Sequence, residues 1–181
     1  MRSGAQDEDY LKLYDEQADS VFRFAYFKLL DRDRAEEVTQ EAFVRTWEYL
    51  QAGKPVDNLR AFVYRVANNI IVDQFRKKRE LSLDALRDEG FDAGFEPLVG
   101  TDLQMDVAAI RKVIDSLDAK YRDAVLLRHV NEISVKEIAV ILGVSENVAS
   151  VRIHRGIEKL RLLVPEDASG RKKELLESDT Q

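Results

Sequence analysis

The side chains best suited to recognising another molecule lie together in one short helical stretch. Asn68 and Asn69 stand side by side within an otherwise apolar pattern, and a run of four basic residues begins at Arg76. An asparagine amide offers a donor and an acceptor that match the edge of an unpaired base, and basic side chains a turn or two away can hold the phosphates of the same strand. Helical steps of four also join Arg65, Asn69 and Asp73 in one stripe, where they could simply bond to one another. Spacing alone slightly favours this local interpretation.

A second group of candidate residues follows a compact series of helix start and stop signals. Ser134 and Glu137 have the spacing of a capping box, and the apolar run after them ends at Gly143. Ser145 is placed to cap the next helix, and Asp118 is placed to cap a helix upstream. Two capped helices separated by a short turn that contains glycine predict a helix-turn-helix.

The helix that starts after Ser145 has two distinct faces. Apolar residues from Ala149 to Leu160 recur on one face and should pack inward. In a helix-turn-helix the other face enters the major groove of DNA, where arginine can contact guanine and flanking cations can hold phosphates. An ordinary exposed helix of a bundle would show the same pattern. The candidate DNA-contacting residues of this helix are Asn147, Ser150, Val151, Arg152, His154 and Arg155.

The elements that must position both groups are predicted to be helices. Apolar stripes at steps of three and four begin at Leu11 and Tyr14, at Ala35 and at Leu59, with no strand-like alternation among them. The predicted fold class is all-α, with two small helical domains joined by an acidic flexible linker, the second domain containing the helix-turn-helix. The predicted boundaries are residues 9–80 for the first domain, 81–105 for the linker, 106–164 for the second domain and 165–181 for a polar tail.

Composition excludes several other kinds of protein. The 181 residues include no cysteine and two histidines, so disulfides and thiolate metal sites are excluded, and we expect no metal and no cofactor. No nucleophile–base pair or glycine-rich phosphate loop indicates catalysis, so we do not expect an enzyme. Neither a signal peptide nor an apolar run long enough to cross a bilayer is found, which predicts a cytoplasmic protein.

Charge is unevenly distributed along the chain, whose formal net charge is −6. Residues 60–80 carry six basic and two acidic side chains, whereas residues 1–50 and 81–106 are acidic. A basic helix between acidic segments is typical of a nucleic-acid contact, and it is also compatible with a solvated charged surface.

Three motifs, in this order, resemble those of the extracytoplasmic-function sigma factors of bacteria, which belong to the sigma-70 family. The family's helix for binding core RNA polymerase is similar to "DRDRAEEVTQEAFVRTWEYL". Its helix for the minus-ten promoter element is similar to "NLRAFVYRVANNIIVDQFRKKRE", and its helix-turn-helix for the minus-thirty-five element is similar to "ISVKEIAVILGVSENVASVRIHRGIEKL". The resemblance covers roughly residues 9–80 and 106–164.

The resemblance implies a protein that joins core RNA polymerase and directs it to promoters. Its implied partners are core RNA polymerase, promoter DNA as duplex and as melted strand, and an anti-sigma factor, with no membrane insertion. The main alternative is a stand-alone helix-turn-helix transcription regulator whose first domain dimerises or senses a ligand.

The resemblance also implies roles for individual residues. A flipped base is expected near Asn69, bounded by the loop "QAGKPVD". The residues implied in minus-ten recognition are Arg65, Asn68, Asn69, Asp73, Arg76, Lys77 and Arg79. Those implied in binding core polymerase are Glu37, Gln40, Glu41, Phe43, Val44 and Arg45.

Overall fold

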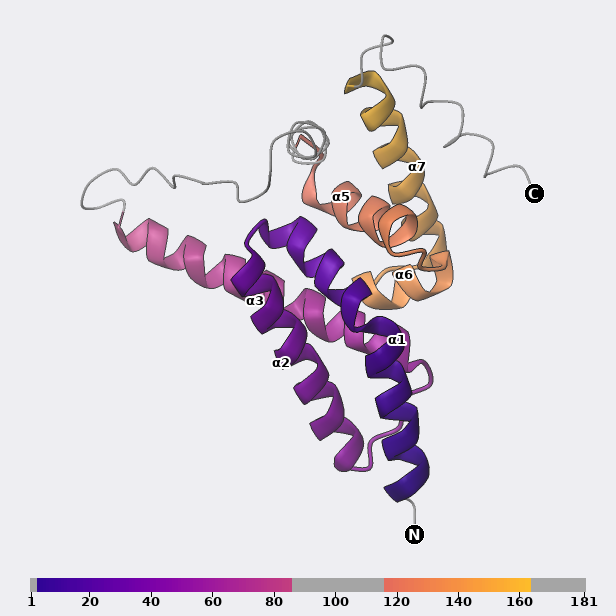
Figure 1. Ribbon diagram of the computed structural model, residues 1–181. Helices are drawn as coiled ribbons and strands as arrows, with labels where there is room; N and C mark the ends of the chain where they lie inside the picture. Colours follow the sequence, from indigo (N-terminus) through magenta and orange to yellow (C-terminus); the bar gives the residue numbers. More distant parts are fainter. Residues whose placement is uncertain (1–2, 86–115, 164–181) are drawn as a thin grey trace, which may run out of the picture.

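The computed structural model describes two stretches of the chain, residues 3–85 and 116–163, with side chains for residues 7–77 and 116–162 (Figure 1). Within these stretches every regular element is a helix, in agreement with the predicted all-α fold. No helix in the same stretches is long and apolar enough to cross a membrane. Most of the predicted linker, residues 106–115, the predicted tail and the side chain of Arg79 lie outside the described residues.

Three helices form the first domain. They are α1 (Ser3–Leu29), α2 (Arg32–Gln51) and α3 (Leu59–Ala85). The N-cap of α2 is Asp31, whose carboxylate accepts the backbone N–H of Arg34 at 3.0 Å. The apolar stripes of the three helices face one another, and burial of each large side chain stabilises the fold by about 1.5–3 kcal/mol. The completely buried side chains include Val21, Phe24, Val38, Val63, Tyr64 and Ile71.

The first domain departs from the sequence predictions in two places. The start of the stripe through Leu11 and Tyr14 is not buried: Leu11 is 60% exposed and Tyr14 is 46% exposed, and Leu13 is buried instead. Farther along the same stripe, Val21 and Ala25 are completely buried, as predicted. The prediction was wrong only for these first members, because apolar residues near the start of α1 fit two adjacent faces and only packing against α2 and α3 selects one. Helix α3 also continues into the predicted linker, to Ala85, since residues 81–85 contain neither glycine nor proline to stop it.

The helix-turn-helix of the second domain is confirmed. Its elements are α5 (Ala119–Val125), the π-helix η1 (Leu126–Val130), α6 (Val135–Leu142) and α7 (Glu146–Leu163). Ser134 and Glu137 form the predicted capping box at the start of α6. Gly143 ends α6 with a φ of 64°, a left-handed conformation that glycine adopts without steric cost. Ser145 then accepts the backbone N–H of Val148 at 3.3 Å at the start of α7.

The beginning of this domain differs from the prediction. Asp118 occupies the N-cap position of α5 but makes no side-chain capping bond. Its Oδ2 instead accepts a hydrogen bond from Lys159 Nζ of α7 at 3.1 Å. After Val125 the helix widens into η1, and Asn131 at its end is buried against the first domain.

The two domains pack against each other, which no local sequence pattern predicts. Helix α6 contacts α3, and η1 contacts α1, while α7 packs on α5 and α6. In Figure 1, α5 and α6 lie between α7 and the first domain. One apolar core joins Val21 and Ala67 of the first domain to Leu127 and Ile138 of the second.

Candidate nucleic-acid interface

The predicted polar stripe of α3 is exposed to solvent. Asn69 is exposed and makes no side-chain hydrogen bond within the described part of the chain. Arg65 lies over the Phe62 ring at 5.2 Å, and Arg76 pairs with Asp73 at 3.2 Å. The expected network among Arg65, Asn69 and Asp73 is therefore absent from the described residues. An exposed pair such as Asp73–Arg76 contributes only about 0–1 kcal/mol, so Asn69 is available to a ligand.

Asn68, its neighbour, lies in a different environment. Its side chain is buried, and Oδ1 accepts a hydrogen bond from Lys28 Nζ of α1 at 2.7 Å. The same Lys28 nitrogen donates to Asp123 Oδ2 of α5 at 2.8 Å. Burial lowers the pKa of Lys28, although the carboxylate of Asp123 opposes that shift. In this arrangement Asn68 cannot reach a base, in contrast to the minus-ten role that the resemblance implies.

Helix α7 presents most of its predicted contact residues on one exposed face. The members on this face are Asn147, Ser150, Val151 and His154, all exposed. Arg152, at the flank, is half-buried, while Ala149 and Gly156 pack inward as predicted. His154 Nε2 lies 3.4 Å from Glu158 Oε1, a pair that is ionic only when the histidine is protonated. The face therefore combines an amide, a hydroxyl, an imidazole and an apolar side chain, which are groups that contact base edges.

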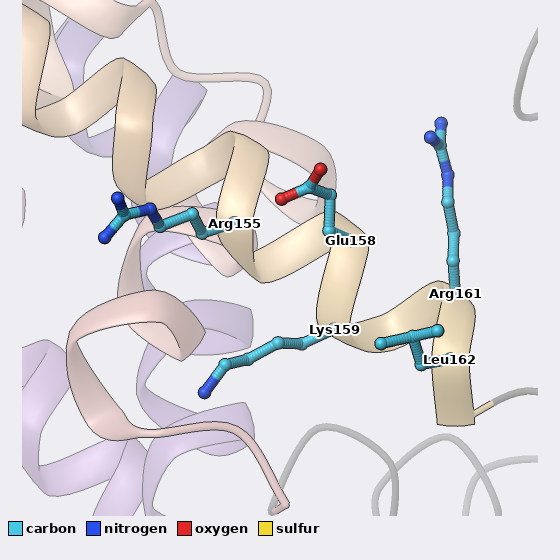
Figure 2. Close-up of a pocket in the computed structure, with 5 residues that line it drawn as sticks. All are labelled: Arg155, Glu158, Lys159, Arg161 and Leu162. Carbon is cyan, nitrogen blue, oxygen red and sulfur yellow. The ribbon is translucent and has the colours of Figure 1, made fainter.

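Arg155 is held on a neighbouring side of α7. Its guanidinium hydrogen-bonds the hydroxyl of Tyr121, and this contact lowers the pKa of Tyr121. Lys159 extends in the same direction, with Nζ 4.8 Å from the Tyr121 ring centre, whereas Arg161 points away from both (Figure 2). Arg155 is exposed too, but its guanidinium is positioned beside α5.

A shallow hollow between η1 and α7 gathers further basic side chains. Arg128 and His129 line it from η1, and Ser150, His154 and Arg161 line it from α7. Arg128 and Arg161 carry no sequence signal of their own, because isolated cations occur on most exposed helices. Only folding places Arg128 of η1 beside the predicted residues, whereas Arg161 lies two helical turns after His154 on α7 itself.

The candidate polymerase surface on α2 is exposed except at one residue. Its exposed or half-exposed members are Glu37, Gln40, Glu41, Val44 and Arg45. Phe43 is only 2% exposed, because the rings of Tyr10 and Tyr14 cover it. The exposed apolar side chain next to it in α2 is Val44, which is 54% exposed. Phe43 can therefore position this surface but offers little contact area itself.

Comparison with known proteins decides among the functional alternatives. The family model for sigma-70 region 2 matches residues 13–81, and that for sigma-70 region 4 matches residues 108–160. The chain belongs to the sigma-70 family, and the curated relatives that it matches are extracytoplasmic-function sigma factors. It is 28% identical to sigma factor SigW of Bacillus subtilis over 171 residues, which cover 89% of this chain and 91% of SigW. It is also 28% identical to SigL of Mycobacterium tuberculosis, over 85% of this chain and 88% of SigL.

Solved structures agree on the fold of this sigma factor. Sigma factor RpoE of Bartonella quintana, solved with the anti-sigma factor NepR, superposes with a TM-score of 0.69 at 22% identity, covering 86% of this chain and 96% of RpoE. CnrH, solved with the cytosolic domain of CnrY, superposes with a TM-score of 0.66 at 20% identity, covering 87% of this chain and 88% of CnrH.

A sigma factor is not an enzyme: it binds core RNA polymerase and directs promoter-specific transcription initiation. A stand-alone helix-turn-helix regulator is not favoured, because region 2 and region 4 both match within this one chain.

Proposed function

We propose that the exposed stripe of α3 captures the melted minus-ten strand, with Asn69 as the base contact. The observation that carries this assignment is the exposed amide of Asn69, which has no hydrogen-bond partner among the described residues and has exposed cations around it. Extruding a base from the stack costs a few kcal/mol, which hydrogen bonds to that base can offset. Arg65, Arg76 and Lys77 would hold the phosphates of the strand, and Asp73 would orient Arg76 through their ion pair.

We propose that α7 reads the minus-thirty-five duplex with its exposed face. Asn147, Ser150, Val151 and His154 are assigned to base edges, because they are exposed near the start of the second helix. Phosphate contacts are assigned to the cations around this face, because Arg155 is already bonded to Tyr121 and the others lie at the flank or in the hollow. These cations are Arg128, Arg152, Arg155 and Arg161.

The remaining assignments concern partners and location. Residues 9–80 would form the unit that binds polymerase and the minus-ten strand, and residues 106–164 the unit that binds the minus-thirty-five element. Core polymerase would dock on the α2 surface around Val44, with Phe43 supporting it from beneath. We propose an anti-sigma factor as a regulatory partner, because the similar RpoE was solved with one. The chain would act in the cytoplasm, where it meets core polymerase and promoter DNA.

Reconstituted run-off transcription tests the residue assignments. The chain and core RNA polymerase are combined with a random promoter library, so that the selected sequences reveal both elements. Asn69→Ala should impair promoter melting, measured with permanganate, while leaving polymerase binding intact. Asn147→Ala, the matched amide deletion in the other domain, should change minus-thirty-five preference and leave melting of a preformed bubble unchanged. Full transcription by Asn69→Ala would disprove its role as a base contact.

A further inference from the structure

A second stripe of α3, beside the exposed one, faces the second domain. Arg60, Tyr64 and Asn68 recur on it at helical steps of four. Lys28 of α1 donates a hydrogen bond to Asn68, and Asn58 precedes the first turn of α3. We call Lys28, Asn58, Arg60, Tyr64 and Asn68 the closure face. It carries two positive charges and no negative charge.

The second domain meets the closure face with carboxylate oxygens. Asp123 Oδ2 accepts from Lys28 Nζ at 2.8 Å, and Glu137 Oε1 accepts from Asn58 Nδ2 at 3.1 Å. Carboxylate oxygens are anionic acceptors, as phosphate oxygens are, and lysine and asparagine side chains bind both.

Backbone oxygens complete the contact. Arg60 Nη2 donates to the carbonyl oxygens of Asn131 and Glu132 at 3.1 and 3.3 Å. Asn131, placed here by the wide turn of η1, donates in return to the carbonyl oxygen of Ser20 at 2.6 Å and to the Tyr64 hydroxyl at 3.3 Å. The cationic groups of the closure face are therefore engaged by oxygen acceptors of the second domain.

The contact combines the shared apolar core with a polar part that is incompletely satisfied. The side chain of Lys28 is 6% exposed and that of Asp123 is 15% exposed, so both charges are largely removed from water. Arg60 Nε and Asn131 Oδ1 are buried without a hydrogen-bond partner among the described residues. Buried charges and unsatisfied polar atoms reduce the net stability that the apolar core gives to the contact between the domains.

We propose that the closure face is a further nucleic-acid contact surface, and that Asp123 and Glu137 occupy it as phosphate mimics in the free chain. The inference rests on the proposed minus-ten role of α3. The closure face adjoins the exposed stripe, so a single strand can contact both only after the second domain leaves. Opening then frees the Asn68 amide and the charges of Lys28 and Arg60 for the strand.

The first test compares two aspartate-to-alanine substitutions in the full chain. Asp123→Ala removes the acceptor of Lys28, whereas Asp118→Ala removes the same charge from a residue whose partner, Lys159, lies in its own domain. The probe is a short fluorescein-labelled single-stranded DNA of random sequence, titrated at one salt concentration. Asp123→Ala should bind it more tightly than Asp118→Ala, because apparent affinity rises by the reciprocal of the open fraction. A chain that is open about one-tenth of the time would gain roughly tenfold.

A second measurement reports the opening itself. The natural chain contains no cysteine, so Glu48→Cys on α2 and Leu162→Cys on α7 can be labelled with a fluorescent donor–acceptor pair. The labelled chain with no substitution other than the two cysteines should show one narrow distribution of energy-transfer efficiency. Adding Asp123→Ala to it should broaden that distribution. Adding Lys28→Met to Asp123→Ala should leave the chain open but remove part of the gain in DNA affinity, since Lys28 itself contacts the strand.

Three outcomes would overturn the proposal. They are an unchanged energy-transfer distribution in Asp123→Ala, opening without tighter DNA binding than Asp118→Ala, and full affinity after adding Lys28→Met. If Asp123→Ala does not fold, Asn131→Ala takes its place, because it removes the hydrogen bonds to Ser20 and Tyr64 without changing the net charge. The first two of these outcomes, observed with Asn131→Ala, would then overturn the proposal. Failure of the unmodified chain in run-off transcription would instead contradict the proposed function, which the energy-transfer experiment does not depend on.

Discussion

Replacing Gly156 with alanine tests how the recognition helix α7 is seated on α5. A Cβ at this position would overlap Val125 Cγ2 and lie 3.4 Å from the carbonyl oxygen of Tyr121. Val125 is buried, and a β-branched side chain in a helix has one strongly preferred rotamer, so the methyl group cannot easily turn away. The helices must therefore separate locally, or the contact is strained.

Two opposing terms set the size of the effect. Alanine is a better helix former than glycine by about 1 kcal/mol. Overpacking a close contact costs about 1–3 kcal/mol. Gly156→Ala should therefore lower the free energy of unfolding by roughly 0–2 kcal/mol, despite its higher helix propensity, and it should also weaken binding to the minus-thirty-five duplex because α7 is displaced.

The assay is urea unfolding followed by circular dichroism, in two backgrounds. Val125→Ala removes the overlapping methyl group, so in that background Gly156→Ala should stabilise the chain by about 1 kcal/mol. The double-mutant cycle then isolates a coupling of about 1–3 kcal/mol between the two positions. An equal stabilisation by Gly156→Ala in both backgrounds would refute the argument, because it would mean that no steric conflict exists.

Three further predictions concern the promoter contacts and the closed arrangement. Asn69→Ala should lower transcription from linear templates more than from templates with a preformed bubble, because base capture assists melting; an equal loss on both would contradict this role. Arg155→Ala should weaken minus-thirty-five binding to a similar extent on all sequences, since its guanidinium is fixed beside Tyr121; a loss of about 1–3 kcal/mol confined to one base position would instead indicate direct readout. Hydrogen bonds from Ser134 and Asn58 outweigh burial and hold the pKa of Glu137 below its usual value. The stabilisation from Glu137 is thus present above its unfolded-state pKa and is lost as the pH falls through the lowered folded-state pKa. Thermal melts at several pH values should show that Glu137→Gln removes this loss of stability in acid. An unchanged dependence of melting temperature on pH in Glu137→Gln would contradict the prediction.

Local features of the fold were predictable because they depend on residues close together in the chain. The capping box of Ser134 and Glu137 and the left-handed Gly143 follow from backbone hydrogen bonding and backbone sterics within one or two turns. Such local rules do not predict contacts between residues as far apart in the chain as Asp118 and Lys159. Asp118 was expected to cap α5, but it bonds to α7 because that partner is near only in the folded domain.

The candidate site was predictable only in part, for the same reason. Periodicity placed Asn69 on the polar stripe of α3, and its exposure agrees with that. Asn68, one residue earlier, points about 100° around the helix, where Lys28 and Asp123 enclose it. Arg128 lies beside the α7 face only because η1 and α7 line the same hollow in the folded domain, and Phe43 is withdrawn from the α2 surface by Tyr10 and Tyr14.

The amino-acid sequence by itself determined the helices, the helix-turn-helix and, through its ordered motifs, membership of the sigma factors. These features depend on helix propensity, on the periodicity of apolar residues and on short-range hydrogen bonds, all of which are set by residues close together in the chain. Only the tertiary structure decided that the two domains close on each other through Lys28, and that adjacent asparagines have different environments. Such contacts join residues up to 111 positions apart, and their energies depend on burial and charge pairing that exist only once the chain has folded.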